Sequence, residues 1–84
     1  MATTSFETSD LYAAAAVKSI LHLPFPDILL TGRLSTFVFA VEPTEAQRVV
    51  NEFYNDSLHV PARRYAQDLR DLKTLICQRR ERKM

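Results

Sequence analysis

The stretch Asp27-Ile-Leu-Leu-Thr-Gly-Arg-Leu-Ser-Thr-Phe-Val-Phe-Ala-Val41 decides the fold of this chain. Its two apolar runs, residues 27–31 and 34–41, have the length and composition of strands. Gly32-Arg33 between them gives the two-residue spacing of a tight hairpin, with the glycine at a positive-φ position. In the second run the residues alternate between two faces, and both faces are apolar. This pattern predicts a central strand that is covered on both sides.

A helix is expected before the hairpin, over residues 11–21. Ser9 is placed to cap it, and Asp10 lies at the positive end of the helix dipole. Its four consecutive alanines, Ala13–Ala16, favour a helix that other elements approach closely. Because the segment is apolar nearly all round, we expect it to be buried on more than one side. The prolines at 24 and 26 end it, and residues 6–8 just before it can form a short edge strand.

Two further helices are expected after the hairpin. Thr44-Glu-Ala-Gln47 fits a capping box, with Pro43 just outside the helix that it starts. The core residues of that helix are Ala46, Val49, Val50 and Phe53. The last helix has Pro61 in its first turn, a favoured place for proline, and its core residues are Tyr65, Leu69, Leu72 and Ile76.

The element order (β)αββαα predicts a small α+β fold. A hairpin or three-stranded antiparallel sheet packed by three helices is the simplest arrangement. The 84 residues allow one domain, residues 1–84. We expect its folded core over 5–78, with flexible tails at 1–4 and 79–84, although the last helix has the alternative of continuing past residue 79.

The composition excludes several classes of protein. Hydrophobic content of 46% and charged content of 25% are ordinary for a folded domain. No signal peptide is evident, and no apolar run approaches the roughly 20 residues that span a bilayer. The single cysteine, Cys77, rules out an intrachain disulfide. These features predict a cytoplasmic protein without a membrane segment.

The charge is strongly divided along the chain. From residue 61 onward there are eight Lys/Arg against three Asp/Glu, whereas residues 1–60 carry three against seven, which gives +5 and −4. The candidate partner-binding residues are therefore Arg63, Arg70, Lys73, Arg79, Arg80, Arg82 and Lys83. Three interpretations stay open: a solvated helix face, nucleic-acid binding by phosphate neutralisation, or a protein partner. For the last, the basic helix can meet the acidic second helix of another copy.

Residues that carry chemistry are few and scattered. His22 and His59 lie at element junctions, so a zinc site is not expected, and a semi-buried structural role is expected for Cys77. The single glycine excludes phosphate-binding loops. The carboxylates at 42, 45, 52 and 56 are expected to complement a helix dipole rather than hold a cation. We predict no catalytic, cofactor or metal site, and we expect Phe37 and Phe39 in the core rather than as a stacking platform for nucleic acid.

Several motifs resemble a family of small bacterial and phage proteins that is known only as a domain of unknown function. They are Thr8-Ser-Asp-Leu-Tyr-Ala-Ala-Ala15, Phe37-Val-Phe39, Asn51-Glu-Phe-Tyr-Asn55, Arg63-Arg-Tyr65 and Leu69-Arg-Asp-Leu-Lys73. The resemblance covers roughly residues 5–76. It implies no activity and no catalytic residue. Such relatives usually have a glycine at the end of the first helix, where this chain has His22.

Together these patterns predict a non-enzymatic interaction or adaptor module, self-associating, in a bacterial, phage or mobile-element setting. Complementary charge across a homo-oligomer suits the division between −4 and +5. The alternative is a weak nucleic-acid-binding protein that uses the basic last helix and tail. A sequence pI near 7.9 is low for that class, where values above about 9 are typical.

Overall fold

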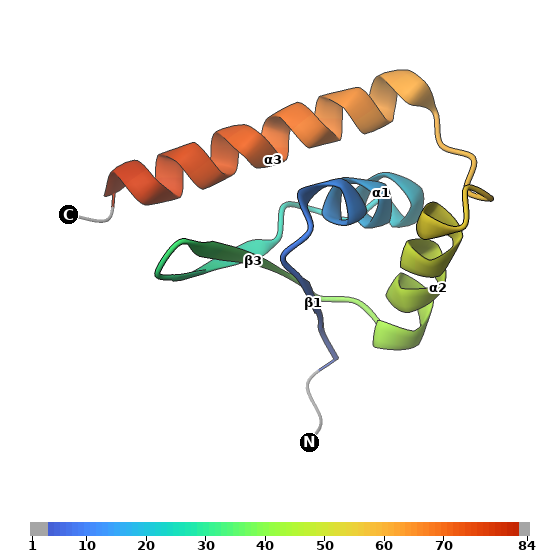
Figure 1. Cartoon of the computed structure of the whole chain (residues 1–84), viewed down its shortest axis with the longest axis horizontal. Coiled ribbons are helices and arrows are strands. Elements are labelled where there is room, and N and C mark those ends of the chain that lie inside the picture. The colour runs from blue at the N-terminus through green and yellow to red at the C-terminus, as the bar shows by residue number, and fades with distance from the viewer. Residues whose placement is uncertain (1–3, 83–84) are drawn as a thin grey trace.

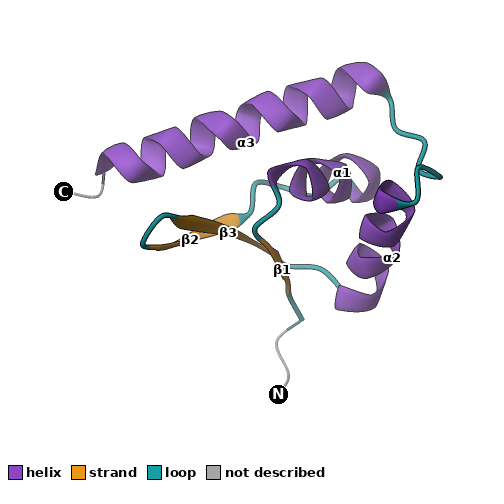
Figure 2. Cartoon of the chain, in the orientation of Figure 1, coloured by secondary structure: helices purple, strands orange, loops and turns teal. Residues whose placement is uncertain are grey.

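The computed structural model describes residues 4–82 and has the expected α+β fold (Figure 1). A three-stranded antiparallel sheet and three helices follow the predicted order, as Figure 2 shows. The elements are β1 (Phe6–Thr8), α1 (Leu11–Leu21), β2 (Asp27–Thr31), β3 (Leu34–Phe39), α2 (Pro43–Tyr54) and α3 (Ala62–Arg82).

The hairpin is confirmed, and β3 is the central strand of the order β1-β3-β2. Thr31 pairs with Leu34 around a two-residue turn, in which Gly32 has a φ of 60°. Phe6 pairs with Phe39 on the other side of β3, which confirms the short edge strand. β3 ends at Phe39, two residues before the expected end of the run at Val41.

The helices cover only one side of the sheet, so the prediction of a strand covered on both sides is wrong. α1 and α3 lie over one face (Figure 1). On that covered side Phe37 and Phe39 are each 1% exposed, which confirms that they pack in the core. On the open side Leu29 and Leu34 are 52% and 54% exposed. Three helices of this length do not surround the sheet, because α1 is itself enclosed between α2 and α3.

The alanines of α1 form the centre of the core. Ala13 to Val17 are fully buried, and α1 contacts α2, α3 and β1, so the expected burial on several sides is confirmed. The N-cap differs from the prediction: Asp10, not Ser9, accepts hydrogen bonds from the backbone N–H groups of Tyr12 and Ala13. Ser9 instead lies 3.0 Å from the hydroxyl of Thr36 on β3. The Asp10 carboxylate thus accepts from two N–H groups that have no partner within the helix, and the Ser9 hydroxyl contacts the sheet instead.

α1 ends on His22, which adopts the left-handed conformation with φ 52° and ψ 48°. Its backbone N–H donates to the carbonyl of Lys18, and its side chain is exposed. A glycine takes this position without steric cost, whereas a residue with a Cβ does not. His22 therefore has a backbone geometry that a glycine would serve.

The capping box predicted for α2 is not formed. The helix begins at Pro43, and its N-cap is Glu42, two residues before the predicted cap Thr44; Glu42 makes no side-chain cap bond. Its carbonyl accepts from the N–H groups of Glu45 and Ala46. Proline favours the first helical turn because its missing N–H is not needed there. The predicted core positions of α2 are confirmed, since Ala46, Val49 and Val50 are buried, and Phe53 is partly buried.

α3 is the longest element, and Pro61 lies just before it with its carbonyl 2.9 Å from the N–H of Tyr65. Leu72 is fully buried, and the other predicted core residues of α3 pack against the core. The helix continues to Arg82, so residues 79–82 are helical where a flexible tail was expected. Among residues 4–82 no helix combines the length and the apolar character that crossing a membrane requires.

Candidate functional site

The buried and exposed sides of α3 differ in charge, and the position of Asp68 is the main reason. Arg64 and Asp68 have the i,i+4 spacing of an exposed ion pair on a helix. Instead, Asp68 turns inward and is 6% exposed. Lys18 Nζ donates to its Oδ1 at 2.9 Å, and Ser19 Oγ donates to its Oδ2 at 2.6 Å. These three residues, the Asp68 cluster, join α3 to α1.

The charges and hydrogen-bonding groups of the Asp68 cluster satisfy one another. Burial by itself raises the pKa of Asp68, but the hydrogen bond from Ser19 and the hydrogen bond and charge of Lys18 outweigh it, so this pKa lies below its ordinary value of 3.8. The ammonium of Lys18 also lies 4.9 Å from the centre of the Phe25 ring, a cation–π contact. Among the described residues no buried side-chain nitrogen or oxygen lacks a hydrogen-bond partner. The cluster therefore serves packing between helices.

The candidate basic residues fall into three groups. Arg63, Arg70 and Lys73 are exposed along the side of α3 that faces away from the core, and we call these three the outer basic face. Their spacing of seven and three residues keeps them on neighbouring rows of the helix.

Two more candidates lie near the end of the helix. Arg80 is tied to the hairpin, since its guanidinium donates to the carbonyl of Arg33 at 2.8 Å and to the hydroxyl of Ser35 at 2.9 Å. Arg79 is exposed and follows Leu72 by seven residues, so it lies on the sheet side of α3.

The remaining candidates concern the chain end. Arg82 belongs to α3, but its side chain is outside the described part of the structure, and so is Lys83 altogether. The structure thus brings three of the seven candidates together and gives Arg80 a role within the fold.

No family model, curated protein or solved structure matches this chain. The resemblance to a domain of unknown function stays a prediction, and the site has to be argued from its own geometry.

A second polar group surrounds Asp10 at the start of α1. The hydroxyl of Tyr54 donates to Asp10, which lowers the pKa of the carboxyl, with the two backbone N–H donors adding to the effect against the opposing influence of burial. The same bond raises the pKa of Tyr54. Tyr65 donates to the carbonyl of Tyr12 at 3.2 Å. Tyr54 is 60% exposed, and these contacts connect the ends of all three helices.

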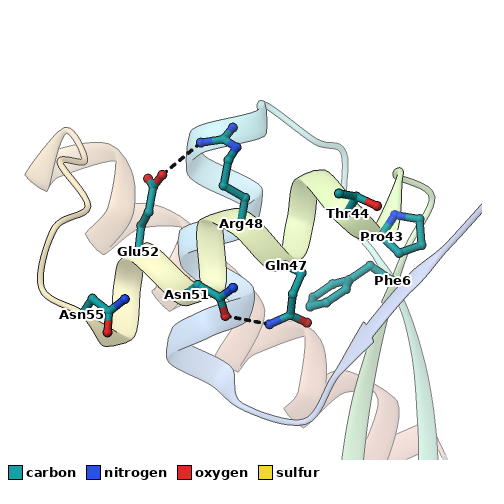
Figure 3. A pocket seen from close by; sticks show the side chains of 8 residues that line it. All are labelled: Phe6, Pro43, Thr44, Gln47, Arg48, Asn51, Glu52 and Asn55. Atoms are coloured by element: carbon teal, nitrogen blue, oxygen red, sulfur yellow. Dashed lines mark hydrogen bonds and ion pairs between the residues drawn. The ribbon is translucent and has the colours of Figure 1, made fainter.

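A shallow hollow of about 630 Å³ lies beside α2 and β1 (Figure 3). Phe6 forms one wall, and polar side chains of α2 form the other. Gln47 donates to Asn51 at 3.0 Å, and Arg48 pairs with Glu52 at 3.3 Å. Because these polar groups bind one another along the helix, few of them are left for a ligand, and the surface of the hollow is mostly apolar.

The other candidates for chemistry lie apart. His59 is exposed, and His22 serves as the helix end described above. Cys77 is exposed, so the expectation of a semi-buried cysteine is wrong; it follows Arg70 by seven residues, which places it on the outer side of α3. Within the described range no three side chains of His, Cys, Asp or Glu gather as a metal site would need.

Sequence reasoning missed Asp68 because a charged residue on an amphipathic helix is usually assigned to the solvent. A signal was present: Asp68 stands between Tyr65 and Leu72 at helical spacing, on the inward side. Lys18, the only basic group of α1, is its natural partner. An acidic residue within the apolar face of one helix and a single basic residue within that of another indicate a buried ion pair.

Proposed function

We propose that this protein is a non-enzymatic interaction module that self-associates and that binds an acidic surface through the outer basic face of α3. The observation that supports it best is the inward position of Asp68. Its carboxylate forms its ion pair with Lys18 inside the fold, and Arg64 of α3 contributes only a weaker charge interaction. The exposed side of α3 is therefore more basic than the sequence of the helix suggests.

The outer basic face has the geometry of a docking surface. Arg63 and Arg70 lie seven residues apart, which is about 10 Å along the helix axis. Gln67, which lies between them on the same side, and Thr74, one turn after Arg70, are neutral. Charges held on a rigid helix attract an acidic partner at long range, and the attraction weakens as salt screens it.

The polar clusters of the fold support a role without catalysis. The Asp68 cluster connects α1 to α3, and Asp10 caps α1 while it binds Tyr54. Each of these carboxylates accepts hydrogen bonds from donors of the protein itself, so we assign both of them to stabilising the fold. We also place the protein in the cytoplasm, where an exposed thiol such as that of Cys77 stays reduced.

Nucleic-acid binding is the second candidate. A hollow of about 530 Å³ at the start of α3 is lined by Arg63 and Arg64, together with Pro61, Gln67 and Asp68. Two arginines beside the positive end of a helix favour a phosphate group. The pI near 7.9 favours the protein partner over this alternative.

Two anionic probes separate the candidates: a labelled polyglutamate peptide and a labelled DNA duplex of about 20 base pairs, at about 50 mM and 300 mM salt. We expect the peptide to bind the wild type by fluorescence anisotropy. The double variant Arg63→Gln, Arg70→Gln should bind at least about tenfold more weakly, a loss of roughly 1.4 kcal/mol.

The control is Arg48→Gln on α2, which removes an exposed arginine of equal charge and should leave binding unchanged. Binding of neither probe at low salt would contradict the proposal. Binding of DNA alone, lost in the same double variant, would favour the second candidate.

Self-association through the acidic α2 of another copy receives less support than the sequence suggested. Arg48 lies 4.0 Å from Glu45 and 3.3 Å from Glu52, so α2 already neutralises part of its own charge. The open, apolar side of the sheet suits a second copy better.

A further inference from the structure

The open side of the sheet is apolar in its middle and charged only at its ends. Along the strand direction it has three rows, which follow from the strand register. The first row is Glu7, Val38 and Asp27. The second contains Thr36 and Leu29, and the third contains Leu34 and Thr31, after which the turn carries Arg33. We call these residues the open face.

The open face is unusual for a surface in contact with water. Leu29 and Leu34 are more than half exposed, and Val38 is only partly buried. On the solvated face of an antiparallel sheet the residues are normally polar, and some of them are charged. Here the middle rows carry leucine and threonine only. An apolar patch rimmed by charge marks an interaction site.

The charges at the rim indicate which partner fits. One end of the open face has two carboxylates, Glu7 and Asp27, and the other end has the guanidinium of Arg33. None of these three side chains has an ion-pair partner among the described residues. A surface with opposite charges at its two ends is complementary to itself when a second copy is turned end to end.

We propose that two copies of this chain pack their open faces together across a two-fold axis, with their strands antiparallel. This inference specifies the self-association that is part of the proposed function. A two-fold axis in the interface and perpendicular to the strands sets Leu29 against Leu29 of the other copy. It also sets Leu34 against Val38 and brings Arg33 toward Asp27. Sheets that pack in this way stay within about 30° of alignment.

The alternative two-fold axis, parallel to the strands, is disfavoured by charge. It superposes the acidic ends of both copies, so that Glu7 meets Asp27 and no cation lies between them. Like charges brought together at an interface are repulsive, which selects the antiparallel arrangement. A hollow of about 240 Å³ beside Val38, lined also by Phe25, lies at the end of the sheet that receives the hairpin tip of the other copy.

The area of the open face sets the strength of the dimer. Strands about 4.8 Å apart with about 3.3 Å per residue give a face of a few hundred square ångströms. A standard interface buries roughly 800 Å² per partner. We therefore expect a weak, reversible dimer with a dissociation constant between about 10 µM and 1 mM.

Sedimentation equilibrium over about 10 µM to 2 mM protein tests the proposal across that range. The wild type should shift from monomer to dimer. Leu34→Glu should raise the dissociation constant at least about tenfold, because it places a carboxylate in the apolar contact. Ala66→Glu makes a similar change on the outer side of α3 and should leave dimerisation as in the wild type.

A charge exchange tests the antiparallel arrangement. Arg33→Asp should weaken the dimer several-fold, since it makes both ends of the open face acidic. Adding Asp27→Arg to it should restore the wild-type dissociation constant. Both positions are exposed, so circular dichroism melting should show little change in either variant. If the double variant is no better than Arg33→Asp, the arrangement is wrong.

The remaining outcomes separate this inference from the proposed function. A wild type that stays monomeric throughout the range overturns the inference and the self-association with it, while probe binding by α3 is measured separately. A dimer that persists in Leu34→Glu overturns the open face and points to another surface, such as the free edge of β2. Leu34→Thr repeats the test with a neutral residue if Leu34→Glu does not fold.

Discussion

The covered and open sides of the sheet have similar apolar side chains and opposite environments. Phe37, 1% exposed, lies on the covered side of β3, and Leu34, 54% exposed, lies on the open side of the same strand. Alternation along one strand thus separates a core position from a surface position only three residues away. Apolar character alone therefore does not show whether a side chain of this strand is buried, because burial depends on which face the helices cover.

The largest effect is expected on the covered side. Phe37→Ala should lower the free energy of unfolding by about 3–5 kcal/mol, because it leaves a cavity among fully packed residues. Val38→Ala, its neighbour on the open side, should cost about 1 kcal/mol or less. Urea denaturation followed by circular dichroism measures both. Equal losses would mean that the two sides are equally packed, contrary to the structure.

The Asp68 cluster connects the two helices on the covered side of the sheet, and its loss should have the second-largest effect on stability. Asp68→Ala should cost about 3 kcal/mol, since it leaves Lys18 partly buried without its counter-ion and Ser19 without its acceptor. Asp71→Ala, one turn away on the same helix and less buried, is the control and should change stability by less than about 1 kcal/mol. A loss in Asp68→Ala no larger than in the control would contradict the role of the cluster.

The same cluster predicts an acid-sensitive stability. The pKa of Asp68 is lower in the folded protein than its ordinary value of 3.8, so its contribution is fully present above that value. As the pH falls through the folded pKa, the carboxylate becomes protonated and the contribution is lost. Thermal unfolding from about pH 5 down to about pH 2 should show this loss, and Asp68→Asn should reduce it. Asp10, whose pKa is lowered too, keeps a residual slope in the variant. An unchanged slope in Asp68→Asn would contradict the assignment.

The end of α3 over the hairpin gives a smaller effect. Arg80→Ala removes two exposed hydrogen bonds to Arg33 and Ser35 and should cost about 1 kcal/mol. Arg79→Ala removes the same charge without a described hydrogen bond and should be nearly neutral. Hydrogen exchange of the hairpin should rise in Arg80→Ala only. Similar exchange in both variants would show that Arg80 does not fix the helix end.

The smallest expected effect is an increase in stability. His22→Gly should stabilise the protein by about 0.5–1 kcal/mol, because glycine adopts the left-handed conformation at the end of α1 without steric cost. His59→Gly, at an exposed position in the loop before α3, serves as the comparison and should not stabilise. Melting temperatures measure both, and a loss of stability in His22→Gly would contradict the strain at this position.

Local patterns predicted most of the elements. The hairpin, the buried alanines of α1 and the core positions of α2 and α3 follow from spacing that each segment carries in itself. The helix ends were less predictable, since Ser9 and Asp10 are both able to cap, and their choice depends on whether the sheet offers Thr36 to the serine. Cys77 was misplaced because the width of the buried side of α3 depends on what packs there.

The candidate site was predictable only in part. Arg63, Arg70 and Lys73 were found by composition and remain exposed, while Arg80 and Asp68 have partners 45 or more residues away in the chain. No spacing within α3 encodes such partners. They exist because the fold brings α3 across α1 and the hairpin.

The order of elements, the residues of each apolar face and the division of charge follow from the sequence, because periodicity and composition are local properties of the chain. Which apolar faces are covered and which charges face outward depends on how the elements pack. The physical reason is that α1 and α3 both lie over the same side of the sheet (Figure 1), with α1 enclosed between α2 and α3. The same enclosure draws Asp68 toward Lys18, and it leaves Leu29 and Leu34 in contact with water.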